Sequence, residues 1–183
     1  MLTRAQIQRL AQRHRIGMQV QERDYLQHLL LSLLYTRSQA LIFKGGTALR
    51  LVYHDNRYSE DLDFNGPNDV DSSEYDDVRP FVVTVLTPEH VLAEKVRALL
   101  MRSKPRDLYD IWLLLNQGVA PDRALITRKL ELYETAFSPQ AVEEAVARVR
   151  ADWERDLRPL LAQFVTYEDV VTDVLERLVE PYE

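Results

Sequence analysis

The sequence contains no cysteine among its 183 residues, and it has only five glycines and two tryptophans. Without cysteine the chain has no disulfide, no thiolate zinc site and no cysteine nucleophile, a composition that suits a reducing compartment. No apolar run approaches the length of a membrane span, and the first ten residues lack an apolar signal core. We therefore expect a cytoplasmic protein with no membrane contact.

Basic residues are fewer than acidic residues. The chain has 23 Lys and Arg against 29 Asp and Glu, which gives a formal net charge of -6. Such a chain is not a general nucleic-acid binder, because counterion release requires Lys and Arg gathered on one face. Any contact with RNA must then use a local basic patch. Hydrophobic residues make up 46% of the chain, enough for the core of one domain or of a small domain with a helical extension.

A glycine motif follows the first strand-like segment of the chain. The segment Leu41–Lys44 runs directly into Gly45, Gly46 and Thr47. At such a junction the backbone can approach a phosphate closely, and the first amides of a helix point outward without partners. The Thr hydroxyl can add a donor or contact a metal. The same pattern is also typical of an ordinary tight turn from a strand into a helix.

Two aspartates lie shortly after this motif. Asp61 and Asp63 occupy alternate positions, so in an extended strand they face the same side. Two such carboxylates can hold Mg²⁺ against a triphosphate. Alone, the pair is as well explained by a solvated pair or a turn cap. Because it follows the glycine motif so closely, the two motifs together indicate a nucleotidyltransferase site that uses an NTP.

The rest of the pattern predicts mostly helices. Strands are expected over residues 41–44, 61–64 and 81–86, and helices over 3–14, 20–36, 45–53, 88–103, 107–117, 122–134, 139–164 and 167–178. The leucine run at 29–34 is apolar nearly all round, which predicts burial, and a break is expected near Pro159. A soft boundary near Gly118–Pro121 divides the chain into an α/β core with N-terminal helices, residues 1–118, and a helical region, residues 119–183.

The chain carries four sequence blocks in a fixed order: FKGGTAL at 43–49, RYSEDLDF at 57–64, LAEKVRAL at 92–99 and KPRDLYD at 104–110. These blocks resemble the AbiEii/AbiGii nucleotidyltransferase-like toxins, the toxic halves of abortive-infection type IV toxin–antitoxin systems. The segment 22–25 resembles the lead-in helix of that family, which usually carries Lys where this chain has Arg23. The resemblance implies an α/β (α+β) fold: a minimal polymerase-β-like nucleotidyltransferase sheet flanked by helices, with a helical C-terminal half.

The motifs and the resemblance together assign a set of site residues. Metal binding falls to Asp61 and Asp63. Nucleotide binding falls to the residues around the two motifs, namely Lys44, Gly45, Gly46, Thr47, Arg57 and Ser59. Catalytic roles fall to Asp61, Asp63, Lys95 and Asp107. For Lys44 and Arg57 the alternative is a solvated surface charge.

The roles of Lys95 and Asp107 are implied by the family. Lys95 lies at the edge of an apolar helix face, from where it can pair with a γ-phosphate; the alternative is a surface lysine that extends along apolar surface to water. Asp107 is expected to position Lys95 or to act as a base on the acceptor hydroxyl. The alternative is a helix N-cap, with Asp110 three residues on in an arrangement like a capping box.

One departure from the family concerns the segment 66–88. It is much shorter than the insert that usually separates the second and third blocks, and no third metal ligand is identifiable in it. The candidates are acidic residues that the sequence otherwise assigns to a solvated loop: Asp69, Asp71, Glu74, Asp76 and Asp77. The chain is then either active with fewer carboxylates or a reduced member of the family.

The resulting hypothesis is an Mg²⁺-dependent nucleotidyltransferase toxin that moves NMP from an NTP to an acceptor hydroxyl. The resemblance implies a tRNA 3′ end as acceptor and a cognate antitoxin as partner. Basic residues that can face RNA or an acidic antitoxin are Arg97, Arg102, Lys104, Arg106, Arg123, Arg128 and Lys129. Three alternatives stay open: a reduced nucleotide-binding scaffold, a nucleotidyl- or phosphotransferase acting on a protein or small molecule, and a helical protein–protein module.

Overall fold

The computed structural model describes residues 1–38, 40–65, 69–71, 75, 77–78 and 81–179. By its internal contacts the chain separates into two compact units. Unit 1 comprises Met1–Leu86 and Arg158–Gln163, and unit 2 comprises Thr87–Leu157 and Phe164–Glu183. The boundary that the sequence suggested near residue 118 therefore falls inside unit 2, where the helices on its two sides pack against each other.

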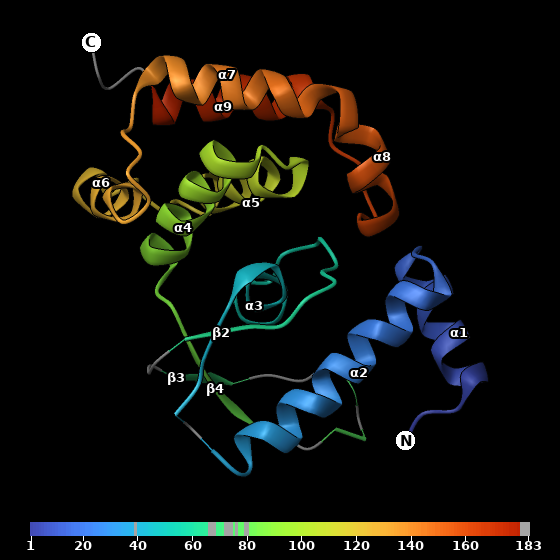
Figure 1. Ribbon diagram of the computed structural model, residues 1–183. Helices are drawn as coiled ribbons and strands as arrows, with labels where there is room; N and C mark the ends of the chain where they lie inside the picture. Colours follow the sequence, from blue (N-terminus) through green and yellow to red (C-terminus); the bar gives the residue numbers. More distant parts are fainter. Residues whose placement is uncertain (39, 66–68, 72–74, 76, 79–80, 180–183) are drawn as a thin grey trace. The chain divides into compact units, whose positions relative to one another are not determined.

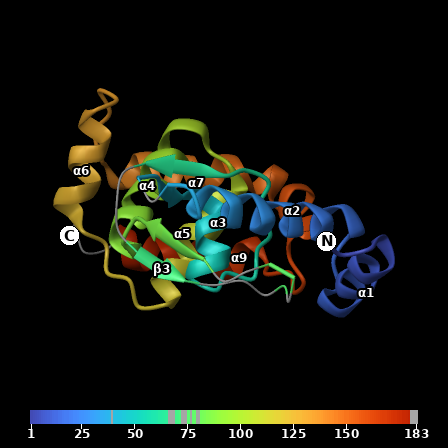
Figure 2. The same ribbon diagram turned by 90° about the horizontal axis from the view of Figure 1, so that it is seen from below.

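Two helices begin unit 1. α1 (Arg4–His14) starts at the predicted cap, where the Thr3 hydroxyl accepts from the backbone N–H of Gln6 and the Gln6 side chain accepts from the backbone N–H of Thr3. α2 (Met18–Tyr35) begins directly after Gly17, which is its N-cap. α1 folds back along α2 (Figure 1, Figure 2). This pairing buries the apolar face of α1.

The sheet of unit 1 has four short strands in the order β2-β1-β4-β3. Its elements along the chain are β1 (Ile42–Lys44), α3 (Gly45–Val52), β2 (Asp63–Asn65), β3 (Asp69–Asp71) and β4 (Val82–Val85). β1 and β4 are parallel, and the two outer pairs are antiparallel. Figure 1 shows α3 following β1 directly, before the chain returns as β2. The glycine motif thus lies at the junction of a strand and a helix, as predicted.

β3 corrects the sequence interpretation of the segment 66–88. An acidic loop was expected there, but the backbone of Asp69–Asp71 pairs with β4, with Val70 opposite Val83. Backbone pairing at a sheet edge requires no apolar side chains, and charged residues are usual on short edge strands. The shortened segment therefore still adds a fourth strand to the sheet.

The core of unit 1 lies between one face of the sheet and two helices. Phe43, Val83 and Val85 are buried in one apolar cluster with residues of α2 and α3. The prediction that the whole leucine run of α2 is buried is wrong: Leu31 is fully buried, but Leu30 is 47% and Leu33 59% exposed. α2 lies on the sheet with one face only, so leucines on its other face remain at the surface.

Unit 2 is helical. Its helices are α4 (Pro88–Arg102), α5 (Pro105–Asn116), α6 (Arg123–Glu131), α7 (Pro139–Val149), α8 (Trp153–Leu157) and α9 (Tyr167–Leu178). α4 contacts α5, α6 and α7, while α5 contacts α8 and α9. The helix expected over 139–164 is already interrupted by a 3₁₀ turn at Arg150–Asp152, earlier than the predicted break near Pro159. In the described part of the chain, no helix combines the length and apolarity required to cross a membrane.

A short segment between α8 and α9 returns to unit 1. The backbone N–H of Tyr58 donates to the carbonyl of Leu160 at 2.9 Å, and Arg57 forms an isolated antiparallel bridge with Leu161. The chain therefore crosses between the two units more than once. This second crossing fixes residues 158–163 beside the loop that follows α3.

Candidate active site

The junction of β1 and α3 is where the sequence predicts a phosphate cradle. Gly45 has a φ of +78°, in the left-handed region that favours glycine. The N-cap of α3 is Lys44, whose side chain makes no capping hydrogen bond. The first amides of α3 therefore have no side-chain cap, and they carry the positive end of the helix dipole. An anion placed there would be stabilised by these amides.

Asp63 lies directly against this junction. A Cβ added to Gly45 would stand 2.2 Å from the Asp63 Oδ2 atom, so only glycine allows the carboxylate to approach this closely. Lys44 is the direct cross-strand partner of Asp63 in the β1–β2 register, and opposite charges stabilise such a pair. Asp63 and Asp61 are both exposed. The structure thus brings the two predicted motifs together, with a carboxylate beside the cradle.

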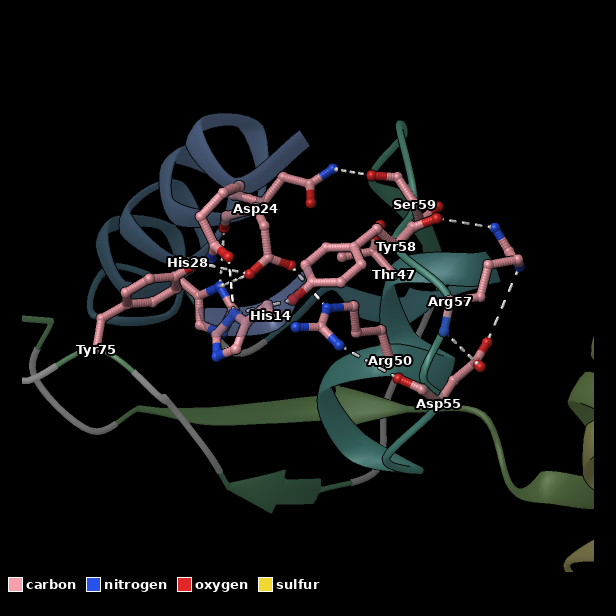
Figure 3. Close-up of polar contacts among 12 residues, drawn as sticks. His14, Asp24, His28, Thr47, Arg50, Asp55, Arg57, Tyr58, Ser59 and Tyr75 are labelled. Atoms are coloured by element: carbon pink, nitrogen blue, oxygen red, sulfur yellow. Dashed lines mark hydrogen bonds and ion pairs between the residues drawn. The ribbon is translucent and has the colours of Figure 1, made fainter. Parts of the chain in front are cut away.

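Gly46 makes room for different side chains than Gly45 does. A Cβ there would stand 2.6 Å from Arg57 Nη2 and 2.7 Å from Ser59 Oγ. Arg57 is only 1% exposed; its backbone N–H donates to Asp55 Oδ1 and its guanidinium donates to the Tyr58 carbonyl (Figure 3). The alternative of a solvated charge at Arg57 is therefore wrong. Arg57 and Ser59 support the cradle from the side of Gly46, and direct contact with a phosphate stays a prediction for both.

Thr47 connects the cradle to the aspartates. Its hydroxyl, expected at a phosphate or metal, donates at 2.5 Å to the backbone carbonyl of Asp61, and the residue is 1% exposed. β2 begins at Asp63 rather than at Asp61 as predicted. The Asp61 carbonyl thus lies outside the strand ladder and takes its hydrogen bond from Thr47. This bond holds the segment that carries both carboxylates.

Replacing Thr47 with valine should loosen this segment. Valine has the same shape but no hydroxyl, so the Asp61 carbonyl loses its donor, at a cost of about 1–3 kcal/mol in the free energy of unfolding. We expect a lower midpoint in urea and a fall in any activity that depends on the two aspartates, whereas Thr47→Ser should retain most of both. Equal stability and activity of Thr47→Val and the parent would show that the bond is dispensable.

A second cluster of the predicted residues lies in unit 2. The Lys95 Nζ atom on α4 is 3.3 Å from Asp107 Oδ1 and 2.5 Å from Asp110 Oδ2, both on α5. Arg102 binds Asp107 through two nitrogens, at 2.8 Å and 2.9 Å. Lys95 is 8% exposed and both aspartates are fully buried. Lys95 is therefore not a surface lysine, and two carboxylates fix the position of its ammonium.

The geometry of Asp107 excludes one of its expected roles and favours another. The N-cap of α5 is Lys104, so the N-cap alternative for Asp107 is wrong. Burial alone would raise the pKa of Asp107, but hydrogen bonds from Arg102 and the charges of Lys95 and Arg102 hold that pKa below its ordinary value. A carboxylate that stays ionised between two cations is a weak base. Its contacts favour the positioning of Lys95.

A buried network that the sequence did not predict joins α2 to α3 (Figure 3). Asp24 is 2% exposed and accepts from Arg50 Nε at 2.9 Å and from the Tyr75 hydroxyl at 2.6 Å. The Arg50 guanidinium also donates to the Asp55 carbonyl and lies 3.6 Å from the centre of the Tyr58 ring. The sequence around Asp24 gives no sign of this burial, because Asp24 follows Glu22 and Arg23, which are charged as well.

A third metal ligand is not evident. Among the described residues, no group of three His, Cys, Asp or Glu could hold a metal ion. Asp77 accepts from the Tyr25 hydroxyl at 2.6 Å and pairs with the N-terminal amine at 3.3 Å, so it has a different set of contacts. Asp69 and Asp71 lie on β3, and Glu74 and Asp76 lie outside the described residues.

Several of the basic residues expected to face RNA have partners within unit 2. Arg97 and Lys129 both bind Glu94, and Arg102 binds Asp107. Lys104 and Arg128 are exposed. The predicted basic surface of the helical half is therefore partly neutralised by neighbouring carboxylates.

Comparison with known proteins gives a matching family model and a similar solved structure. The family model described as nucleotidyl transferase AbiEii toxin, type IV TA system, matches residues 29–78 and 65–177. Among solved structures, the chain is similar to MenT4, a nucleotidyltransferase toxin from Mycobacterium tuberculosis H37Rv, with 21% identity and a TM-score of 0.68 over 97% of this chain and 88% of that one. At this identity the likeness shows a shared fold, which confirms the mixed α/β class. No curated protein sequence matches the chain significantly.

Proposed function

Because the chain belongs to the AbiEii nucleotidyl transferase toxins of type IV toxin–antitoxin systems, we propose that it transfers NMP from an NTP to the 3′ hydroxyl of a tRNA, with Mg²⁺ held by Asp61 and Asp63. The family is one of nucleotidyltransferase toxins, and it implies an NTP substrate and an antitoxin partner. Enzymes of this kind generally use a divalent metal. The choice of Mg²⁺, the tRNA acceptor and the roles of individual residues are proposed.

The observation that supports this site best is the approach of Asp63 to Gly45. The Asp63 Oδ2 atom lies where a Cβ of residue 45 would be, next to the uncapped N-terminus of α3. A negative carboxylate beside an anion-binding helix end is unfavourable if the site holds phosphate alone. It becomes favourable when a cation lies between the carboxylate and the phosphate.

The residues present fit a divalent cation with oxygen ligands. Asp61 and Asp63 supply two exposed carboxylates, and substrate phosphates commonly complete the coordination of Mg²⁺. When bound, the metal would neutralise charge on the triphosphate during in-line displacement. Gly45 and the following amides of α3 would hold phosphate oxygens. Lys44, paired across the strands with Asp63, would add a positive charge beside them.

Lys95 is proposed to bind a phosphate oxygen, with Asp107 as a positioning residue. The ammonium of lysine has three N–H groups. In the described residues of unit 2, its partners are Asp107 and Asp110, which leaves one N–H for a phosphate oxygen. Because Arg102 also binds Asp107, the four charged groups balance, and an incoming phosphate would meet an oriented donor.

The position of the label identifies the reaction. The protein is incubated with total tRNA and each NTP in turn, labelled with ³²P at the α- or the γ-phosphate. We expect label on tRNA from one α-labelled NTP and none from any γ-labelled NTP. Removal of divalent cations with EDTA should abolish the transfer, and added Mg²⁺ should restore it. The RNA products are separated on a denaturing gel.

Each other outcome points to a different function. A γ-label on the product would indicate phosphoryl transfer. An α-label on a protein or small molecule, with none on tRNA, would exclude the tRNA acceptor and retain the transferase. Absence of transfer to any acceptor from the folded protein would support the reduced nucleotide-binding scaffold.

A further inference from the structure

Unit 1 contains a pocket that the proposed reaction does not use. Its volume is about 480 Å³. We call it the arginine pocket, and it is lined by Arg13, His14, Arg15, Arg50, Asn56, Tyr58, Ala162 and Gln163. Three of these residues are arginines and none is acidic. In a chain with a net charge of -6, this is a local concentration of positive charge.

The end of α1 brings neighbouring basic residues to this pocket. Arg15 has a left-handed backbone, with φ 56° and ψ 40°, and helices that end in this conformation usually have glycine there. Its N–H donates to the carbonyl of Gln12, and the N–H of Ile16 donates to that of Ala11, which are the bonds of a Schellman motif. The turn allows Arg13, His14 and Arg15 all to line one pocket. The chain thus has an arginine at a position where glycine would be less strained.

The charges in the pocket differ in how far they are compensated. Arg50 is paired with Asp24, and its guanidinium stacks on the Tyr58 ring. The His14 Nδ1 atom contacts Gln21 Oε1 at 2.7 Å and the Tyr58 hydroxyl at 3.1 Å, as seen beside Arg50 in Figure 3. The side chains of Arg13 and Arg15 form no hydrogen bond or ion pair with any residue that the structure describes. Two guanidinium groups therefore remain for an external anion.

We propose that the arginine pocket binds phosphate groups of the acceptor RNA, an inference that rests on the proposed function in taking RNA as the acceptor. Guanidinium groups match phosphate oxygens in paired hydrogen bonds. Arg97, Lys129 and Arg102, by contrast, are held by carboxylates in unit 2. The uncompensated charge of Arg13 and Arg15 is therefore better suited to a polyanion.

The arginine pocket lies where an RNA strand bound at the cradle could continue along α3. The cradle is at the N-terminus of α3, and Arg50 and Asn56 lie near and beyond its C-terminus. Eight helical residues span about 12 Å, which corresponds to three or four nucleotides at about 3.4 Å per stacked nucleotide. The amides of Asn56 and Gln163 add donors and acceptors that suit the 2′-hydroxyls of RNA.

The test uses Arg15→Gly, Arg13→Gln and the double variant, with Arg9→Gln as the control. Glycine is favoured at position 15, so Arg15→Gly should be at least as stable as the parent. Arg9 is an exposed arginine of α1 outside the pocket, and its replacement removes the same charge. Binding of fluorescein-labelled tRNA to the full chain is measured by anisotropy at several salt concentrations, without NTP. The KM for tRNA and the KM for the NTP are measured separately.

The expected result is a selective loss of RNA affinity. The slope of log K against log salt should fall by about one for each arginine removed. The double variant should raise the KM for tRNA at least about tenfold at moderate salt, with kcat and the KM for the NTP unchanged, and Arg9→Gln should have little effect. If the double variant transfers NMP and binds tRNA as tightly as the parent, the proposal that the arginine pocket binds RNA is wrong, and the proposed transferase function is unaffected.

Failure of the proposed function gives a different result. The parent could bind tRNA without labelling any RNA. If the salt slope of that binding still falls in the double variant, RNA binding by the arginine pocket is supported and the transfer reaction is not. If polyglutamate competes with tRNA at equal charge concentration, and the double variant loses binding to both alike, an acidic protein segment is the better ligand and the RNA inference is wrong.

Discussion

Replacement of Asp63 with asparagine is expected to lower kcat for nucleotidyl transfer by about 10³-fold or more, equivalent to about 4 kcal/mol of activation free energy. Asparagine has nearly the same shape, so β2 and its pairing with β1 should be retained. The lost negative charge removes a ligand that the proposed metal site requires. Asp61→Asn should have an effect of the same order. The rate of tRNA labelling with saturating NTP measures both.

Glu60→Gln is the matched control for this prediction. Glu60 is the exposed neighbour of the aspartates and pairs with Arg23 at the surface, so its replacement removes one carboxylate from the same segment. Its transfer rate should stay within about threefold of the parent, since exposed pairs contribute at most about 1 kcal/mol. A rate for Asp63→Asn near that of the control would place the metal ligands elsewhere. Excess Mg²⁺ that partly restores Asp63→Asn would support its role as a ligand.

The local motifs of the fold were predictable because they depend on near neighbours in sequence. The Thr3 cap, the strand-to-helix junction at Gly45 and the bounds of α9 all follow from a few adjacent residues. Family resemblance then added the expectation that Lys95 and Asp107 act together. The contact between them is formed across two helices, and the structure contains it.

Burial of polar residues was much harder to predict. Arg57 and Asp24 are both nearly inaccessible, and nothing in their own sequence segments indicates this. Each depends on partners distant in sequence: Asp24 requires Arg50 and Tyr75, and the loop at Arg57 is bridged by Leu161. Helix periodicity assigns a side chain to a face, but not the partner that will cover that face.

The leucine run of α2 and strand β3 were missed for a related reason. The run was predicted to be buried on composition alone, although a helix that lies on a sheet buries only one face. β3 was taken as a loop because aspartates are rare in strands, yet its pairing partner β4 supplies the apolar neighbour. In both cases the outcome depends on which helix or strand packs beside the segment, and the sequence of the segment alone does not give this.

Replacement of Asp107 with asparagine should destabilise unit 2 by about 3–5 kcal/mol at pH 7, because Lys95 loses a buried counter-charge and Arg102 loses a bidentate partner. Urea unfolding followed by circular dichroism measures the change. Glu144→Gln, which breaks a surface pair with Arg148 on α7, is the control and should cost less than about 0.5 kcal/mol. A cost for Asp107→Asn no larger than the control would show that the cluster does not stabilise the helices.

The pH dependence separates the charge of Asp107 from its shape. Its pKa is lower in the folded protein than the ordinary value of 3.8, so the unfolded state binds the proton more readily as the pH falls. The stability gained from the ionised carboxylate is fully present above about pH 5 and is lost as the pH falls below 3.8 toward the folded pKa. The difference in unfolding free energy between the parent and Asp107→Asn should therefore shrink from pH 6 to pH 3. A constant difference over that range would show that Asp107→Asn loses stability through packing. The negative charge of Asp107 would then contribute nothing to its pairing with Lys95.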